Sequence, residues 1–298
     1  MPDSAKKNGL PFALAAYLAW GFLPLYLRLL HDVPAVELVA WRVIFTLPFC
    51  LAIAAFRRQL PEIARALRNW RVLRLLLISA VLIAANWVIY IVAVNGGHVL
   101  AASLGYYINP LVNVLLGTLF LGERLNRLQW LAVAVAAAGV AVLLGGAIET
   151  LAISLSLAAS FGLYGLVRKL APVGSLPGLS IESLVLVPVA AATVWWFAQG
   201  PALSSFGHDS RTSLLLVGAG VVTAVPLLCF AVAARRMDLS LLGFVQFLSP
   251  TIAFVLGLTV FGEPLRPVQV ASFALIWTAI GLFCWDLLRR HSGAKPPA

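Results

Sequence analysis

The stretch Leu104-Gly105-Tyr106-Tyr107-Ile108-Asn109-Pro110, followed by Leu121-Gly122-Glu123-Arg124-Leu125, occurs in two related copies in this chain. The second copy lies 140 residues later, as Phe244-Val245-Gln246-Phe247-Leu248-Ser249-Pro250 and Phe261-Gly262-Glu263-Pro264-Leu265. Residues that are identical at this one offset are Pro110/Pro250, Gly117/Gly257, Gly122/Gly262, Glu123/Glu263, Leu125/Leu265 and Gln129/Gln269. Because Glu and Gln are scarce in this chain, composition alone does not explain these matches. The sequence therefore predicts an internal repeat.

The composition is typical of a membrane protein. Of the 298 residues 62% are hydrophobic and 11% are charged, whereas soluble domains carry about 45–50% apolar and about 25% charged residues. The net charge of +10 does not indicate nucleic-acid binding, because the basic residues lie in short segments between apolar runs. Cys50, Cys229 and Cys284 lie inside apolar runs, without paired spacing or clustered His. We therefore expect no disulfide, no metal site and no cofactor.

The apolar runs predict an all-α membrane protein of about ten transmembrane helices. A hydrocarbon core of about 30 Å takes roughly 20 residues of helix. Proline at the expected first turns and glycine at breaks separate the runs. The predicted spans are Pro11–Leu30, Val36–Phe56, Val72–Val94, His98–Leu121, Leu128–Gly146, Leu151–Leu170, Gly178–Gln199, Ser213–Ala234, Leu239–Phe261 and Pro267–Leu288.

The links between the spans carry an uneven share of basic residues. One side of the membrane holds three, Arg28, Arg211 and Arg266, while Arg42 lies within a span. The bias places both termini in the cytoplasm and fixes an even number of spans. We expect the membrane to be a bacterial inner membrane. The other side holds seventeen: Lys6, Lys7, Arg57, Arg58, Arg65, Arg68, Arg71, Arg74, Arg124, Arg127, Arg168, Lys169, Arg235, Arg236, Arg289, Arg290 and Lys295.

Each copy of the repeat holds five spans, an odd number, so the second copy has to enter the membrane from the opposite side. The predicted organisation is a first five-helix repeat over 9–147, a second, inverted repeat over 148–288 and a cytoplasmic tail over 289–298. Many secondary transporters are built from inverted repeats, because exchanging the conformations of two similar halves opens a central site to alternate sides. The alternative is an old duplication that left only a scaffold.

Several segments resemble the EamA domain of the drug/metabolite transporter superfamily. They are Ala19-Trp20-Gly21-Phe22, Gly105-Tyr106-Tyr107-Ile108-Asn109-Pro110, Phe120-Leu121-Gly122-Glu123-Arg124-Leu125 and Gly262-Glu263-Pro264-Leu265. Others look like its RarD branch, namely Asn95-Gly96-Gly97-His98, Ser103-Leu104-Gly105-Tyr106 and Ser160-Phe161-Gly162-Leu163-Tyr164-Gly165. The resemblance runs from about Gly9 to Asp286 and implies ten helices, both termini inside, and export of small metabolites. Members of the superfamily include amino-acid exporters of the aromatic type, and RarD-type proteins are named by association with chloramphenicol.

The fourth and ninth predicted spans each carry a face of polar, proline and small residues. We expect the paired prolines to lie beside a central pathway, because a carbonyl freed at membrane depth is tolerated only inside protein or beside water. The alternative for the glycines is a helix-packing seam, since small residues let helices approach closely. The two faces are Ser103, Tyr106, Pro110, Asn113 and Gly117 in the fourth span, and Gly243, Gln246, Pro250, Ala253 and Gly257 in the ninth.

Aromatic and amide side chains on other spans are further candidates for lining the pathway. A cavity of such groups suits a ligand with an apolar body and a few hydrogen-bonding groups. Aromatic residues at span ends, such as Trp70, Trp130 and Trp285, are instead expected to be interfacial anchors. The remaining pathway candidates are Tyr17, Trp20, Asn86, Tyr90, Asn109, Tyr164 and Phe230.

Arg42 and Glu182 are the two charges within predicted spans, and they align at the same offset of 140. A charge in lipid costs roughly 3 kcal/mol or more, so each should face the interior of the protein. Inversion places them near opposite faces of the membrane, which argues against a salt bridge between them and suggests equivalent gates. The alternative is that each binds backbone carbonyls or a helix terminus.

The sequence favours export of an amphipathic metabolite, most of all an amino acid with an apolar side chain. Nucleotide-binding and hydrolase motifs do not occur in the sequence, which argues against ATP-driven transport and hydrolysis. The alternatives to a transporter are an intramembrane enzyme and a receptor. A partner other than the small-molecule substrate and the lipid bilayer is not indicated, and the residues leave the oligomeric state open. Proton-coupled and facilitative transport both fit, although scarce intramembrane carboxylates favour the facilitative mode.

Overall fold

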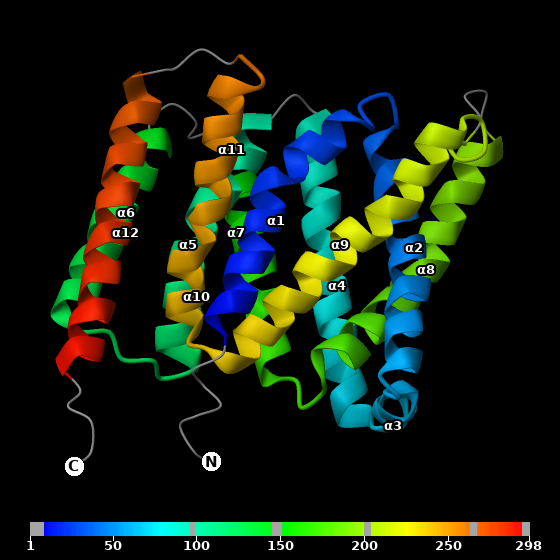
Figure 1. Ribbon diagram of the computed structural model, residues 1–298, viewed down its shortest axis with the longest axis horizontal. Coiled ribbons are helices and arrows are strands. Elements are labelled where there is room, and N and C mark those ends of the chain that lie inside the picture. The colour runs from blue at the N-terminus through cyan, green and yellow to red at the C-terminus, as the bar shows by residue number, and fades with distance from the viewer. Residues whose placement is uncertain (1–8, 96–98, 145–150, 200–203, 263–266, 294–298) are drawn as a thin grey trace.

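The computed structural model of the chain describes residues 9–95, 99–144, 151–199, 204–262 and 267–293, and these form a bundle of helices (Figure 1). No strand occurs within these ranges, which confirms the predicted all-α class. The helices are α1 (Leu10–Arg28), α2 (Ala35–Phe56), α3 (Leu60–Arg68), α4 (Trp70–Asn95), α5 (Val99–Phe120), α6 (Arg127–Leu144), α7 (Leu151–Leu170), α8 (Ser175–Gln199), α9 (Ser210–Arg236), α10 (Leu239–Gln246), α11 (Leu248–Thr259) and α12 (Pro267–Gly293).

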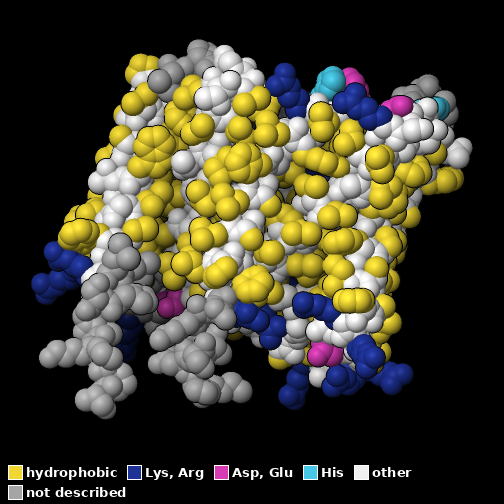
Figure 2. Space-filling model, viewed as in Figure 1, with side chains coloured by type: hydrophobic (Ala, Val, Ile, Leu, Met, Phe, Trp, Pro, Cys, Tyr) yellow, Lys and Arg dark blue, Asp and Glu magenta, His cyan; other side chains and the backbone are white. Residues whose placement is uncertain are grey.

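Among the described residues, eight segments are long and apolar enough to cross a membrane, and two shorter apolar helices, Leu104–Phe120 and Arg127–Leu143, accompany them. Together they coincide with the predicted spans to within a few residues, while the number of ten crossings stays a prediction. Large hydrophobic side chains are exposed along these helices, and Figure 2 shows them over the middle of the bundle. Such a surface is stable against lipid tails, since water would leave it unfavourably hydrated.

The two ends of the bundle differ in charge. α1 begins and α12 ends at the end drawn at the bottom of Figure 1, which we call the lower end, and the opposite one the upper end. Dark blue Lys and Arg side chains gather along the lower edge in Figure 2. The charge asymmetry expected from the sequence is therefore present among the described residues.

Helices from the first half of the chain pack mainly on helices from the second half. α2 packs on α8 and α9, α4 and α5 pack on α7, α1 packs on α9 and α11, α5 packs on α10, and α6 pairs with α12. Glycine allows the closest of these contacts. A Cβ on Gly220 would lie 2.5 Å from the backbone carbonyl carbon of Phe45, and one on Gly243 would lie 2.7 Å from the carbonyl oxygen of Pro110.

One helix was not predicted. The segment between the second and third spans contains α3, nine residues long, which Figure 1 places at the lower end. Ile63 and Ala66 are buried on one side of α3, and Arg65 and Arg68 lie in its last turn. This pattern is typical of a helix that lies in the membrane interface.

The predicted span Leu239–Phe261 is broken into two helices. α10 ends at Gln246 and α11 begins at Leu248, so that Pro250 falls in the first turn of α11. Proline lacks the N–H that would bond the carbonyl of Gln246, and its ring would clash there, so a helix start is the favourable place for it. Pro110, by contrast, lies inside the continuous helix α5.

Candidate functional site

A small cavity lies inside the bundle between α2, α4, α7, α8 and α9. It leaves room for about one water molecule. Two residues expected from the sequence, Tyr164 and Glu182, form part of its wall. The complete lining consists of Val43, Thr46, Ile83, Trp87, Tyr164, Leu179, Glu182, Ser183, Leu186, Thr223 and Leu227.

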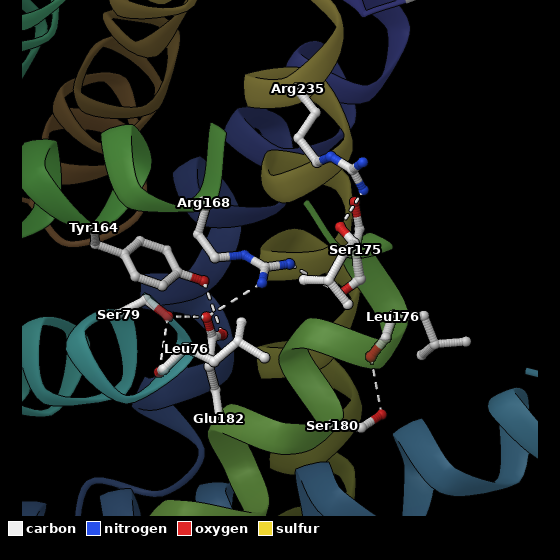
Figure 3. Close-up of polar contacts among 10 residues, drawn as sticks. Leu76, Ser79, Tyr164, Arg168, Ser175, Leu176, Ser180, Glu182 and Arg235 are labelled. Carbon is white, nitrogen blue, oxygen red and sulfur yellow. Dashed lines mark hydrogen bonds and ion pairs between the residues drawn. The ribbon is translucent and has the colours of Figure 1, made fainter. Parts of the chain in front are cut away.

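Glu182, on α8, lies in a buried polar cluster (Figure 3). The hydroxyl of Ser79 from α4 donates a hydrogen bond to Oε1, and the hydroxyl of Tyr164 from α7 donates one to Oε2 at 3.4 Å. Nη1 of Arg168 lies 3.4 Å from Oε1, and the two charged side chains are 0% and 1% exposed. A carboxylate so far from water is stable only because these groups compensate its lost hydration.

The position of Arg168 corrects one expectation. The sequence analysis counted it among the basic residues of a link, whereas it lies inside α7 with its side chain buried. Its Nη2 also donates to the carbonyl of Ser175 at 3.0 Å. Gly178 makes room for the guanidinium, because a Cβ there would lie 2.0 Å from Nη1. Arg168 continues the four-residue spacing of Ser160 and Tyr164, and this signal could have placed it on the interior face.

Arg42 lies in the second turn of α2, towards the upper end, and is half-buried. Its Nε donates to the hydroxyl of Thr223 at 2.8 Å, and its guanidinium lies 5.9 Å from the centre of the Trp87 ring. Thr223 and Trp87 both line the cavity. Among the described residues Arg42 has no carboxylate partner, and it makes no contact with Glu182.

Tyr90 and Tyr106 lie near Arg42, and their ring centres are 6.2 Å apart. Asn86 is buried one turn before Tyr90 and joins α4 to α7, because its amide donates to the carbonyl of Leu157 at 2.9 Å and to the hydroxyl of Ser160 at 3.0 Å. The side chain of Ser103, another candidate, lies outside the described residues.

Four of the predicted aromatic residues meet in one cluster in the lower half of the bundle. We call Tyr17, Trp20, Phe161, Tyr164 and Phe230 the aromatic cluster. Neighbouring ring centres in it lie between 5.2 Å, for Phe161 and Phe230, and 6.4 Å, for Tyr17 and Phe230. Tyr17 and Phe230 are fully buried. The cluster therefore packs α1, α7 and α9 together, and through Tyr164 it borders the cavity.

The remaining candidates lie on α5 and α10, which pack on each other, and on α11, which packs on α1. Asn109, Pro110, Gln246 and Pro250 are buried, and none of them lines the cavity. Asn113, on the same face of α5, donates to Oε1 of Gln246 at 2.8 Å. Their place in transport stays a prediction.

At the lower end, Glu123 of the repeated Gly-Glu motif contacts the amino end of α10. Glu123 accepts hydrogen bonds from the backbone N–H groups of Leu239 and Ser240, at 2.6 and 2.8 Å, and from the Ser240 hydroxyl at 2.7 Å. These groups form the amino end of α10, where the helix dipole favours a negative charge. Lys169 lies 3.8 Å from Glu123 and donates to the carbonyl of Met237, which ends α9. The sequence singled out Glu123 as conserved between the repeats but gave no partner for it.

Comparison with known proteins gives consistent relatives. The EamA-like transporter family matches residues 7–145. Protein RarD of Salmonella typhimurium is 46% identical over 97% of this chain and 98% of its own. An uncharacterized transporter of Pseudomonas aeruginosa is 44% identical over 97% of each chain. A protein of the same organism that is named chloramphenicol-sensitive protein RarD is 32% identical over 96% of this chain and 97% of its own. One crystal structure, 18% identical, covers 93% of this chain and 97% of its own with a TM-score of 0.72, which shows a shared fold.

Proposed function

Because the chain belongs to the EamA-like transporter family and to its RarD branch, we propose that it exports small amphipathic metabolites, chiefly amino acids with apolar side chains. The chain is a multi-pass membrane transporter. Export across a bacterial inner membrane, with both termini in the cytoplasm, is the expected setting. The observation that carries the choice of substrate is Arg42.

Arg42 is a positive charge inside the bundle whose only described hydrogen bond goes to a neutral hydroxyl. A guanidinium at such depth is stabilised by a carboxylate, which it binds through two parallel hydrogen bonds. The carboxylate of an amino acid can fill this role. Trp87, Tyr90 and Tyr106 near Arg42 offer ring faces to an apolar side chain and, through their π-electrons, to an ammonium group.

Two contacts close the lower end of the bundle in this conformation. The aromatic cluster packs α1 against α7 and α9, and Glu123 binds the amino end of α10. Both contacts join residues of the proposed first repeat, 9–147, to residues of the second, 148–288. A substrate can reach the cavity from the lower end only when these contacts separate. Alternating access then amounts to exchanging which end of the bundle is sealed.

The test is counterflow in proteoliposomes. Labelled phenylalanine is compared with phenylethylamine, which has the same ring and ammonium group but no carboxylate. We expect uptake of phenylalanine to exceed that of phenylethylamine, and Arg42→Gln to lower phenylalanine uptake roughly tenfold, since hydrogen bonds to charged groups contribute about 1.5–3 kcal/mol. Arg28→Gln is the matched control, because Arg28 lies at the upper end on the Val260 carbonyl, away from the cavity.

Chloramphenicol is the second candidate, since a relative carries that word in its name. It has no carboxylate, so its transport would not depend on the charge of Arg42. Flux of chloramphenicol without flux of any amino acid would replace the amino-acid proposal with a drug permease. Strong flux of a sugar phosphate would overturn both.

A further inference from the structure

Four carboxylates within the described part of the chain are shielded from water, and three of them have fixed structural partners. Glu37 binds both the hydroxyl and the backbone N–H of Ser205 at the upper end. Glu123 binds the amino end of α10, and Asp286 accepts from the amide of Asn126 at 2.7 Å. At least one partner of each is an N–H group, which can donate to a carboxylate oxygen but cannot accept a hydrogen bond from a protonated carboxyl group.

Glu182 differs from these three in two respects. It alone of the four lines the cavity. Its neighbours Ser79 and Tyr164 are hydroxyls, which can turn to accept a hydrogen bond from a protonated carboxyl group as well as donate to an ionised one. Arg168, by contrast, cannot lose its proton in a protein, so its presence at 3.4 Å favours the ionised form. The site therefore has partners for both protonation states, and the position of Arg168 selects between them.

We propose that Glu182 is the proton-binding group that couples this transporter to a proton gradient, with Arg168 as the positioning residue that expels the proton. The inference rests on the proposed transport function and adds its energy source. It also departs from the facilitative mode that the scarcity of intramembrane carboxylates in the sequence favoured.

The charges around the site come from several helices. From α7 come Arg168 and Tyr164, from α4 Ser79, and from α2 the thiol of Cys50, which lies within electrostatic range of Glu182. From α9, Thr223 belongs to the cavity wall. Arg235, also on α9, lies near Arg168 and donates a hydrogen bond to the carbonyl of Val173. Glu62 of α3 interacts electrostatically with Arg235. Arg168 is thus the one cation in direct contact with Glu182 among the described residues (Figure 3).

The proton follows the movement of this pair. When α7 and α8 shift against each other within the second repeat and Arg168 moves away, a carboxylate left in an apolar cavity is stable only as the neutral acid. Glu182 then takes a proton from the compartment that the site faces. When the pair forms again, the proton leaves Glu182 on the other side of the membrane. One proton enters the cell for each metabolite molecule that leaves, and the exchange forms or breaks no other covalent bond.

The first experiment uses proteoliposomes with an imposed pH gradient and labelled phenylalanine as the probe. A gradient of one pH unit can sustain about a tenfold concentration ratio when one proton exchanges for one zwitterion. We expect the wild type to approach this ratio and Glu182→Gln to fall to a ratio of about one, and counterflow without a gradient is measured on the same preparations for comparison. Accumulation driven by the gradient in Glu182→Gln would overturn the proposal.

Two further variants guard against a folding defect. Glu182→Gln leaves Arg168 buried without a counter-charge, which by itself destabilises a protein. The double variant Arg168→Gln/Glu182→Gln removes both charges, and we expect it to fold, as its thermal unfolding in detergent should show, and to lose gradient-driven accumulation. Asp286→Asn is the matched control, because it removes a shielded carboxylate outside the cavity, and it should accumulate phenylalanine as the wild type does.

A second measurement does not depend on the substrate. A protonated carboxyl group has an infrared carbonyl band that an ionised one lacks, and each of the eleven acidic residues contributes such a band as the pH falls. The difference between the titrations of the wild type and of Glu182→Gln should isolate the band of Glu182. This band should be absent from the double variant and present in Asp286→Asn. If the wild type moves no amino acid, the proposed substrate fails, and this band still decides the proton site. The absence of a titrating band, or its persistence in the Glu182 variants, would overturn the proposal.

Discussion

Gly117 has no side chain at the point where α5 comes close to the Glu123–Ser240 contact. A Cβ there would lie 2.4 Å from Oε2 of Glu123 and 2.9 Å from the Ser240 hydroxyl. We predict that Gly117→Ala displaces the carboxylate from the amino end of α10, at a cost of about 1–2 kcal/mol, which is typical of a lost helix cap. The measurement is the midpoint of thermal unfolding in detergent, which should fall by a few degrees.

Gly281 is the matched control for this variant. It also lies in a long apolar helix, and a Cβ there would meet no atom within 4 Å. Gly281→Ala should therefore leave the midpoint unchanged or raise it slightly, since alanine favours a helix more than glycine does. Equal midpoints for the two variants would contradict a role for Gly117 in seating Glu123.

At the residue scale the sequence located one member of the buried pair and misplaced the other. Glu182 stood out because an acid within an apolar run has to face the interior. Arg168 is followed by Lys169 and lies near a helix end, so it was assigned to a link with the other basic residues. The four-residue spacing from Ser160 through Tyr164 to Arg168 was the signal that separates Arg168 from its neighbour, and in the structure the guanidinium lies 3.4 Å from Glu182.

A single side chain, Glu123, binds the amino end of α10 through three hydrogen bonds. We predict that Glu123→Gln weakens this contact, because the amide carries no charge for the helix dipole and has only one acceptor oxygen. The lower end should then open more often. The measurement is the labelling rate of Ser183→Cys, a small residue of the cavity wall, by an impermeant thiol reagent from the lower side, in a background without Cys50, Cys229 and Cys284. The rate should rise.

Asp238→Asn is the control for Glu123→Gln. Asp238 occupies the N-cap position of α10 and its side chain makes no capping hydrogen bond. Its loss removes the same charge from the same helix end without removing a contact. A labelling rate that rises equally in both variants would show that net charge, and not the Glu123 contact, keeps the lower end closed.

At the element scale the sequence predicted the long helices well and two details poorly. Apolar runs of about 20 residues leave little choice but a membrane helix, so their positions followed from length and composition. α3 was missed because only nine residues, rich in arginine, form it, and its two buried residues give a weak signal. The break at Phe247 was missed because proline inside a span is compatible both with a continuous helix, as at Pro110, and with a broken one, as at Pro250.

At the scale of the whole molecule, the inverted pair of repeats stays a prediction, and the packing agrees with a repeat of five helices. At the offset of 140, α1 is equivalent to α7, α4 to α9, and α5 to α10 and α11. Exchanging equivalent helices converts the contact of α1 with α11 into that of α7 with α5, and the contact of α4 with α7 into that of α9 with α1. Both contacts of each pair occur. Gly122 and Gly262, equivalent at the offset of 140, have φ angles of 65° and 67°, a conformation that glycine adopts without strain. The repeat therefore extends from sequence to local backbone geometry.

An inverted pair of repeats also requires that equivalent ends of the two repeats lie on opposite sides of the membrane. Arg68, at the end of α3, and His208, between α8 and α9, are both exposed and lie at the lower and upper ends. The excess of Lys and Arg at the lower end predicts that this end faces the cytoplasm. In intact cells an impermeant thiol reagent should therefore label His208→Cys and leave Arg68→Cys unlabelled until the membrane is opened. Labelling of both from outside, or of neither, would be incompatible with an odd number of crossings between them. Labelling of Arg68→Cys alone would show that the protein has the opposite orientation, and the direction assigned to transport would then be reversed.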